Sequence, residues 1–338
     1  MNNIVEVNNL VKHYYVHEKE AGLKGSLKSF FNRNNKIIKA VDNISLRIAP
    51  GEIVGFLGSN GSGKTTTLKM LSGLLHPTEG QIKVAGFTPK YRQHGFLSSI
   101  TLVMGQKQQL DWDLCAEDSF LLHQAIYEIP DRTYRRRVAE MTEMLELKGL
   151  LNKQVRKLSL GERMKCELAI ALLHQPKIVF LDEPTIGLDV NMQQAVREFI
   201  AQYNEYYGAT IILTSHYMAD LTALAKRILV INSGKLIFDG DLKSFTEQKA
   251  PHKVLKLQFI EPQPAHILRR YGTVRSHVAN IAELLVEHVA VTKTAVELLK
   301  NLPVADISIE DIPIEEVVRE VFRSGQVKLK HSNNFEKS

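Results

Sequence analysis

One glycine-rich segment near residue 60 has the residue types and spacing of a phosphate-binding loop, G-x-x-x-x-G-K-[ST]. Its glycines let successive N–H groups point inward around a phosphate, and the start of the following helix adds positive potential. The lysine can reach the β- and γ-phosphates of a nucleotide, and the threonine hydroxyl can ligate Mg²⁺. The alternative is a glycine-rich turn with a solvated lysine; the apolar run before the loop and the helical segment after it disfavour that. We expect ATP contacts from Gly58, Ser59, Asn60, Gly61, Ser62, Gly63, Lys64, Thr65 and Thr66.

Two consecutive carboxylates, Asp182 and Glu183, follow a second apolar run. In doubly wound α/β sheets, ligands bind where the strands end, which is where this pair would lie. Phosphoryl transfer needs one carboxylate for Mg²⁺ and a second group that orients or deprotonates the attacking water. We therefore predict that Asp182 and Thr65 hold the metal and that Glu183 is the catalytic base. Taken alone, an acidic pair after a strand is more often a solvated turn.

The elements that must position these residues alternate between short strands and longer helices. Apolar runs typical of buried strands occupy 53–57, 177–181 and 210–213. Helical periodicity follows Asp131, which we expect to be an N-cap, and recurs around 196–203. Residues 66–74 are expected to form the helix after the phosphate loop, and 227–240 to form two strands joined by a turn. The pattern predicts an α/β fold with a largely parallel sheet over residues 1–245.

A second, smaller domain is predicted over residues 252–325, after a boundary near Pro251. It begins with a strand at 254–259, continues with a strand near 282–288 and a helix from Thr292, and has a third strand near Ile307. An amphipathic helix over 314–322 follows. The segment 326–338 is polar, so we expect a disordered tail.

The two catalytic motifs belong to a longer set that resembles the ATP-binding cassette (ABC) ATPases over residues 1–245. Gln106 resembles the family glutamine that contacts Mg²⁺ and the attacking water, and His216 the histidine that contacts the γ-phosphate. Leu158-Ser-Leu-Gly-Glu162 resembles the ABC signature at a helix start, Asp189 the loop that couples two sites, and Tyr14 the aromatic residue against adenine. The resemblance implies a P-loop cassette with an antiparallel β subdomain and a helical subdomain over about 106–175.

Each of these residues alone has a simpler interpretation. Gln106 lies in a glutamine-rich stretch, a lone His216 is more often structural, and Tyr14 has an adjacent rival in Tyr15. Ser159 is at least an N-cap, the commonest role of a serine before a helix. Their joint occurrence in family order is what favours the functional interpretation.

The signature departs from the family pattern LSGGQ at two positions, with Leu160 for glycine and Glu162 for glutamine. In the family, the signature of one copy meets the ATP held by the phosphate loop of another copy. The resemblance therefore implies a head-to-tail dimer in which Ser159 and Gly161 contact the partner's nucleotide. Glu162 would bring a negative charge close to that nucleotide.

An insertion at about 16–38 separates this chain from a minimal cassette. Within it, 22–36 has leucines and phenylalanines on one helical face together with lysines and an arginine. A basic amphipathic segment of this kind can lie on an anionic membrane surface or on a membrane subunit, and equally can pack on its own cassette.

The composition is that of a globular protein, with 44% hydrophobic residues and a net charge of +6. No apolar run approaches the roughly 20 residues that cross a bilayer, and no secretory signal is recognisable. Cys115 and Cys166 lack metal-ligand spacing and are expected to be buried thiols. These features predict a cytoplasmic location, here at the inner face of the membrane.

The insertion, the segment 104–113 and Met218-Ala-Asp220 resemble a bacterial branch that groups with exporters of drugs, lipids and polysaccharides. That resemblance implies two separate permease subunits as partners, docking near Leu110 to Phe120, and a regulatory or dimerising C-terminal domain. No nucleic acid partner is expected. Two alternatives stay open, an importer ATPase and a non-transport ABC ATPase that acts on ribosomes or nucleic acid.

Overall fold

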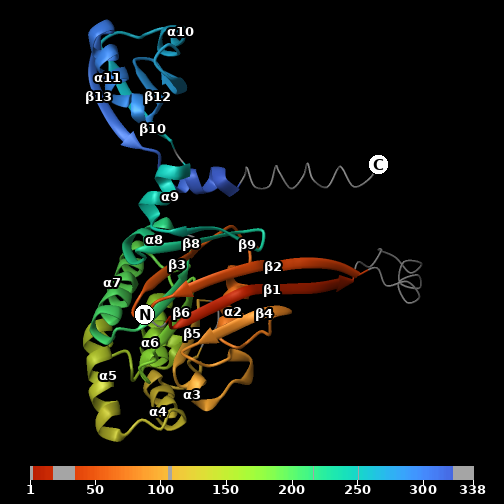
Figure 1. The fold of residues 1–338 in the computed structure, drawn as a ribbon. Coiled ribbons are helices and arrows are strands. Elements are labelled where there is room, and N and C mark those ends of the chain that lie inside the picture. Colours follow the sequence, from red (N-terminus) through yellow and green to blue (C-terminus); the bar gives the residue numbers. More distant parts are fainter. Residues whose placement is uncertain (1–2, 18–34, 106–108, 216, 250, 323–338) are drawn as a thin grey trace, which may run out of the picture. The chain divides into compact units, whose positions relative to one another are not determined.

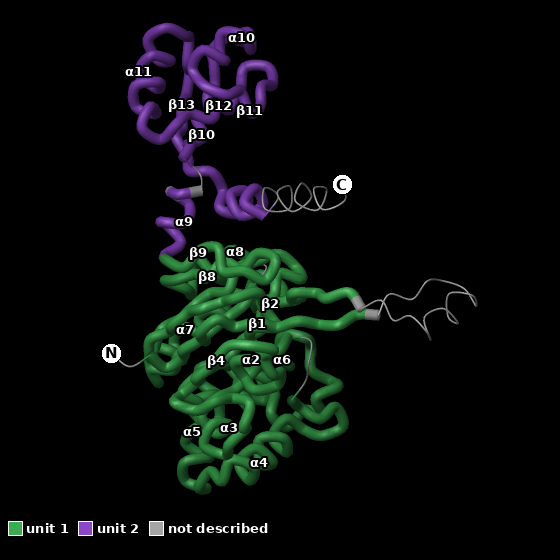
Figure 2. The backbone as a smooth tube through the Cα atoms, turned by 45° about the vertical axis from the view of Figure 1, so that its right-hand side comes forward, with its two compact units in different colours: residues 1–240 green, residues 241–338 purple. Residues whose placement is uncertain are grey.

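The structure is a computed structural model that describes residues 3–17, 35–105, 109–215, 217–249 and 251–322. The centre of the predicted insertion, Gln106, His216 and the tail 326–338 lie outside the described residues. The chain divides into two compact units, residues 1–240 and residues 241–338 (Figure 2). No helix within the described ranges is both long and apolar enough to span a bilayer.

A six-stranded sheet with strand order β5-β6-β7-β3-β8-β9 is the centre of the first unit (Figure 1). Neighbouring strands from β5 to β8 pair in parallel, and β9 pairs antiparallel with β8. This confirms the predicted largely parallel sheet and the final two-stranded turn. The strands are β3 (Ile53–Leu57), β5 (Ile100–Met104), β6 (Ile178–Asp182), β7 (Thr210–Thr214), β8 (Arg227–Asn232) and β9 (Lys235–Gly240).

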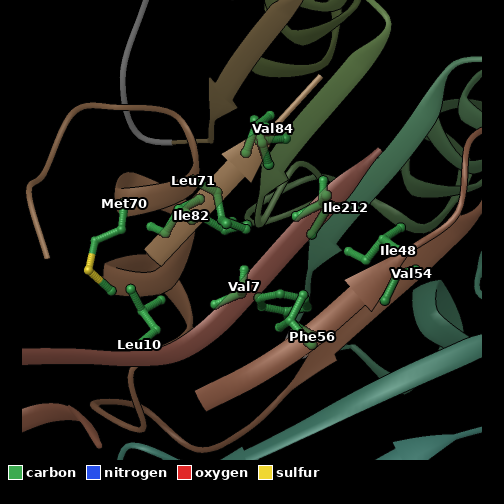
Figure 3. Packing of buried hydrophobic residues seen from close by; sticks show 14 of the residues in the cluster. Val7, Leu10, Ile48, Val54, Phe56, Met70, Leu71, Ile82, Val84 and Ile212 are labelled. Atoms are coloured by element: carbon green, nitrogen blue, oxygen red, sulfur yellow. The ribbon is translucent and has the colours of Figure 1, made fainter. Parts of the chain in front are cut away.

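An antiparallel sheet with order β2-β1-β4 packs against the first sheet. Its strands are β1 (Val5–His17), β2 (Asn35–Ile48) and β4 (Glu79–Val84). One hydrophobic core joins the two sheets and the helix α2, as Figure 3 shows with Val7 of β1 near Phe56 of β3 and Leu10 of β1 near Met70 of α2. The loop between β3 and α2 is thereby fixed to a rigid base.

The helices of the first unit follow the predicted order with small shifts. The helix after the phosphate loop begins at Lys64, two residues earlier than predicted, and Pro130 rather than Asp131 is the N-cap of α5. Asp131 is instead the first helical residue, where its charge still complements the helix dipole. The helical segments are α2 (Lys64–Leu71), η1 (Pro89–Tyr91), α3 (His94–Leu97), α4 (Ala116–Ile126), α5 (Asp131–Leu145), η2 (Val155–Lys157), α6 (Leu160–Leu172), α7 (Val190–Tyr207) and α8 (Met218–Leu224).

The second unit is an antiparallel sheet of order β11-β12-β10-β13 with helices. Its core is formed by Leu255, Leu257 and Phe259 of β10 with Leu284 and the helix residue Leu298. The strand β11, in which no residue is fully buried, was not predicted from the sequence. The elements are α9 (Leu242–Lys249), β10 (His252–Phe259), α10 (Ala265–Leu268), β11 (Thr273–Val278), β12 (Ile281–Glu287), η3 (His288–Ala290), α11 (Val291–Asn301), β13 (Val304–Asp311) and an α-helix that includes 314–322, as predicted.

The two cysteines are both free, but only one is buried as predicted. Cys166 is fully covered within α6, and burial raises the pKa of its thiol to about 12. Cys115 is half-buried, because it precedes α4 at the surface of the helical region.

Candidate active site

The loop 58–63 connects the end of β3 to the first residue of α2, as the sequence predicts. Gly63 has φ +112°, and a Cβ there would lie 2.4 Å from the carbonyl oxygen of Ala40. Only glycine avoids both the backbone strain and that overlap. The Thr67 amide donates to Gly63 O at 2.9 Å, so the helix starts directly behind the loop. Unpaired amides at a helix start are suited to an anion.

Lys64 is 5% exposed and lies inside the loop that precedes it. Its Nζ donates to Gly58 O at 2.6 Å and to Ser59 O at 3.1 Å. Burial lowers the pKa of this ammonium group, while the charges of Glu183 and Asp182 act in the opposite direction. The amine thus lies among backbone carbonyl oxygens, and a phosphate oxygen could replace them as its partner.

Asp182 lies where three elements of the first unit meet. Its Oδ1 accepts from Thr65 Oγ1 at 3.1 Å, from the start of α2, and from Thr214 Oγ1 at 2.7 Å, from the end of β7. One hydroxyl and one carboxylate at this separation are a suitable donor pair for Mg²⁺, which usually binds one or two protein oxygens and completes its shell with waters and phosphates. The donor chemistry of the residues present therefore fits the ion.

Glu183 leaves the strand in an unusual backbone conformation. Its φ is +56°, in the left-handed region that costs a non-glycine residue roughly 1–2 kcal/mol. Its amide donates to Thr214 O at 3.1 Å and to Thr214 Oγ1 at 3.2 Å, which fixes the turn. Local strain of this kind is concentrated at functional sites, where the surrounding structure imposes it. Lys64, Thr65, Asp182 and Glu183 are thus brought together by the fold.

The signature-like segment begins α6, and Ser159 is its N-cap. Ser159 and Glu162 form a reciprocal capping box, and Glu162 also pairs with Lys153. Gly161 is in close contact with α7, because a Cβ there would lie 2.7 Å from Met192 Cε. The partners of Ser159 and Glu162 named here belong to α6 and to Lys153, and none of them belongs to the phosphate loop 58–63.

Asp189 caps the neighbouring helix α7, and its Oδ1 accepts from the Met192 amide at 2.9 Å. Since Met192 also lies against Gly161, the structure brings Asp189 and the signature-like segment together. The fold of one chain therefore contains two clusters of the predicted residues, one around the phosphate loop and one around the start of α6.

Tyr14 and Tyr15 lie on β1 with opposite orientations, because successive strand residues point to opposite faces. Tyr14 is 39% exposed with Lys12 Nζ 5.4 Å from its ring centroid, and Tyr15 is 62% exposed. One of them can therefore face a base while the other faces away. Tyr14 stays the predicted adenine contact.

Gln106 and His216, both predicted to be catalytic, lie outside the described residues. The strand residues before them are placed: Met104 pairs with Asp182 in the parallel sheet, and Asp182 pairs with Thr214. Both chain segments therefore leave the sheet beside Asp182.

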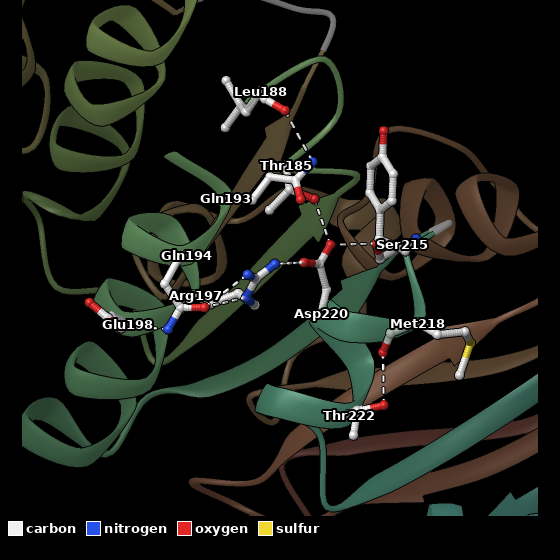
Figure 4. A network of polar contacts seen from close by, with 11 residues as sticks. Thr185, Leu188, Gln193, Gln194, Arg197, Glu198, Ser215, Met218, Asp220 and Thr222 are labelled. Atoms are coloured by element: carbon white, nitrogen blue, oxygen red, sulfur yellow. Dashed lines mark hydrogen bonds and ion pairs between the residues drawn. The ribbon is translucent and has the colours of Figure 1, made fainter. Parts of the chain in front are cut away.

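A buried polar network behind the site was not predicted from the sequence (Figure 4). Asp220 is fully buried and accepts from Arg197 at 2.9 Å, from Thr185 at 2.5 Å and from Ser215 at 2.6 Å. Thr185 follows Glu183 by two positions, and Ser215 precedes His216. The network therefore ties both loops to α7 and α8. A single arginine next to the apolar face of the α7 segment was the only signal for it in the sequence.

The chain is similar to several known proteins. A family model described as "ABC transporter" matches residues 41–186, and one described as "EvrA-like ABC transporter, C-terminal domain" matches residues 251–310. The ABC transporter ATP-binding protein NatA of Bacillus subtilis is 34% identical over 219 residues, which is 65% of this chain and 89% of that protein.

Other relatives include a doxorubicin resistance ATP-binding protein, DrrA, of Mycobacterium tuberculosis, 34% identical over 60% of this chain and 61% of its own length. The Nod factor export ATP-binding protein I of Burkholderia pseudomallei is 33% identical over 66% of this chain and 72% of its own length. Among solved structures, the dimeric ATP-binding cassette MJ0796 bound to ADP and Pi is 26% identical with a TM-score of 0.57, covering 70% of this chain and 98% of that one.

Proposed function

Because this chain belongs to the family of ABC transporter ATP-binding proteins, we propose that it is the motor of an exporter whose membrane-spanning subunits are separate chains. It is an ABC ATP-binding subunit and an ATPase. The observation that carries the assignment of its active site is the junction of Lys64, Thr65, Asp182 and Glu183 at the ends of β3 and β6.

In this site the chain's own groups have separate roles. The amides of loop 58–63 and the Lys64 ammonium bind the phosphates, and Tyr14 stacks on adenine. Thr65, Asp182 and Gln106 would hold Mg²⁺, which supplies charge neutralisation at the β- and γ-phosphates. Glu183 accepts the proton of the attacking water, or orients it, and His216 contacts the γ-phosphate.

Two copies of the chain would complete each site. Ser159 and Gly161 of one copy meet the γ-phosphate bound to the other, and Asp189 couples the two sites. The proposal is supported by the position of these residues, because they gather around the start of α6 in a cluster separate from the one around the phosphate loop. A dimeric relative bound to ADP and Pi supports it as well. ATP closes the pair and hydrolysis releases it, a shift in population that a permease can follow as motion.

The direction of transport and the membrane partners are inferred from relatives named for drug resistance and for Nod factor export. A docking surface for two permease subunits would include Trp112, 48% exposed, with Leu114, Leu121, Leu122 and Ile126, all more than 40% exposed. The chain would then lie at the cytoplasmic face of the membrane. The exposed Tyr15 and Ile37 flank the basic segment 22–36 and support its contact with an anionic membrane surface.

The test combines turnover and partners. Glu183→Gln should bind ATP but hydrolyse it about 10²- to 10⁴-fold more slowly, as expected for loss of a general base. Glu205→Gln, an exposed carboxylate on α7, is the matched control and should retain activity. The tagged chain should co-purify with a polytopic permease from native membranes. Co-purification of ribosomal proteins or nucleic acid without a membrane protein would contradict the transport role.

A further inference from the structure

The carboxylate of Glu162 is fixed at the start of α6 by two different partners. Its Oε2 accepts from the Ser159 amide at 2.8 Å, and its Oε1 lies 3.3 Å from Lys153 Nζ. The backbone bond from Ser159 and the pairing with Lys153 both lower the pKa of Glu162, so it is an anion at neutral pH. The negative charge noted in the sequence is therefore real and has a defined position.

That position lies beside the groups that would receive the partner's nucleotide. Ser159 Oγ accepts from the Glu162 amide at 3.2 Å, and the Ser159 hydroxyl also contributes a hydrogen bond to the Glu162 carboxylate, for which a phosphate oxygen would compete. Ser159 and Leu160 are exposed at the helix start, which leaves room for a second molecule to approach. A γ-phosphate that bonds to Ser159 would come within a few ångströms of the Glu162 carboxylate, and like charges at that separation repel.

Lys153 is positioned to cancel that repulsion. It is nine residues before Glu162, and its backbone is tied on both sides, with its amide donating to Leu150 O at 3.0 Å and its carbonyl accepting from Ala116 N at 3.4 Å. Its side chain is 47% exposed and is therefore accessible to a second molecule. The charges of Lys153 and Glu162 offset each other, so the partial positive charge at the start of α6 is left to attract an anion.

We propose that Lys153 is a positioning residue of the signature segment, which neutralises Glu162 so that the segment can accept the γ-phosphate held by a second copy. This inference rests on the proposed head-to-tail dimer. It explains how a signature with glutamate in place of glutamine remains compatible with a nucleotide, and it assigns a role to a lysine outside the family's motifs.

The experiment measures the ATP concentration that gives half-maximal dimerisation, by light scattering with Mg²⁺ present, in the Glu183→Gln background. Lys153→Gln should raise that concentration about fivefold, because the Glu162 carboxylate then repels the partner's phosphate with no neighbouring cation to offset it. Adding Glu162→Gln should restore it, because glutamine keeps the capping box without the charge. Lys153→Arg should stay close to the unmodified protein. Lys148→Gln, the same charge change at an exposed lysine nearby, is the matched control and should have no effect.

Rescue by Glu162→Gln separates this role from a structural one, because a damaged fold would not be repaired by a second substitution. Melting temperatures should change little among these variants, since exposed ion pairs contribute little to stability. ATP-driven dimerisation that is unaffected by Lys153→Gln, or that Glu162→Gln fails to restore, would overturn the role of Lys153 alone. Absence of any ATP-driven dimer, while one copy still binds ATP, would overturn the dimer and this role together.

Discussion

Replacement of Asp220 tests whether the buried network in Figure 4 holds the two catalytic loops. Its side chain is 0% exposed, and it is the carboxylate partner of Arg197, itself only 10% exposed. Removing one partner of a buried ion pair costs about 3–5 kcal/mol, because the other charge is left in a poorly solvated position. Asp220→Asn keeps the shape of the side chain, so we expect a loss near the lower end of this range.

The loss is converted into a melting temperature through the size of the folding unit. The first compact unit has 240 residues, and a domain of that size shifts by about 2 °C per kcal/mol. Asp220→Asn should therefore lower the melting temperature by about 6 °C or more in a thermal scan. Glu198→Gln makes the same charge change on an exposed residue of the helix that carries Arg197, and should change stability by about 0.5 kcal/mol at most.

A second substitution distinguishes the ion pair from simple packing. With Arg197→Met added to Asp220→Asn, no charge is left unpaired, and part of the lost stability should return. ATP turnover of Asp220→Asn should fall more than ATP affinity, because Thr185 and Ser215 lie next to the hydrolytic residues rather than in the phosphate loop. An unchanged melting temperature, or a double variant whose loss equals the sum of the single losses, would refute the reasoning.

Two further predictions concern pH and the phosphate loop. His174 stacks on Tyr127 with ring centroids 3.9 Å apart and contacts Ile100 O at 3.1 Å, and burial lowers the pKa of its ring to about 4. The unfolded chain therefore binds the extra proton first. The contribution of this histidine to stability is complete above pH 6.5 and is lost as the pH falls toward 4, by about 1–3 kcal/mol. The free energy of unfolding, measured by urea titration at a series of pH values, should fall more steeply with decreasing pH in the native protein than in His174→Gln, and only in that window. Gly63→Ala should abolish ATP binding or unfold the loop, because its Cβ would lie 2.4 Å from Ala40 O, and nucleotide binding with native affinity would show that the loop adapts.

Much of the fold could be predicted because hydrophobic periodicity is local. The parallel strands β6 and β7 are nearly continuous apolar runs, and α7 has a regular apolar face, so both kinds of element were recognisable. Strand β11 was missed because it is an edge strand with no fully buried residue, and its pairing with β12 depends on a partner elsewhere in the chain. The N-cap of α5 was misplaced by one residue because Pro130 and Asp131 are both compatible with a helix start.

The candidate active site divides in the same way. The sequence by itself determined the phosphate loop, the acidic pair and the order of the family motifs, because glycine, lysine and carboxylate at fixed spacing have few other uses. Only the tertiary structure decided which groups neutralise one another: Arg197 with Asp220, and Lys153 with Glu162. These partners are 23 and 9 residues apart and share no motif. Electrostatic interactions depend on distance and burial in the folded chain, and neither can be obtained from residue order alone.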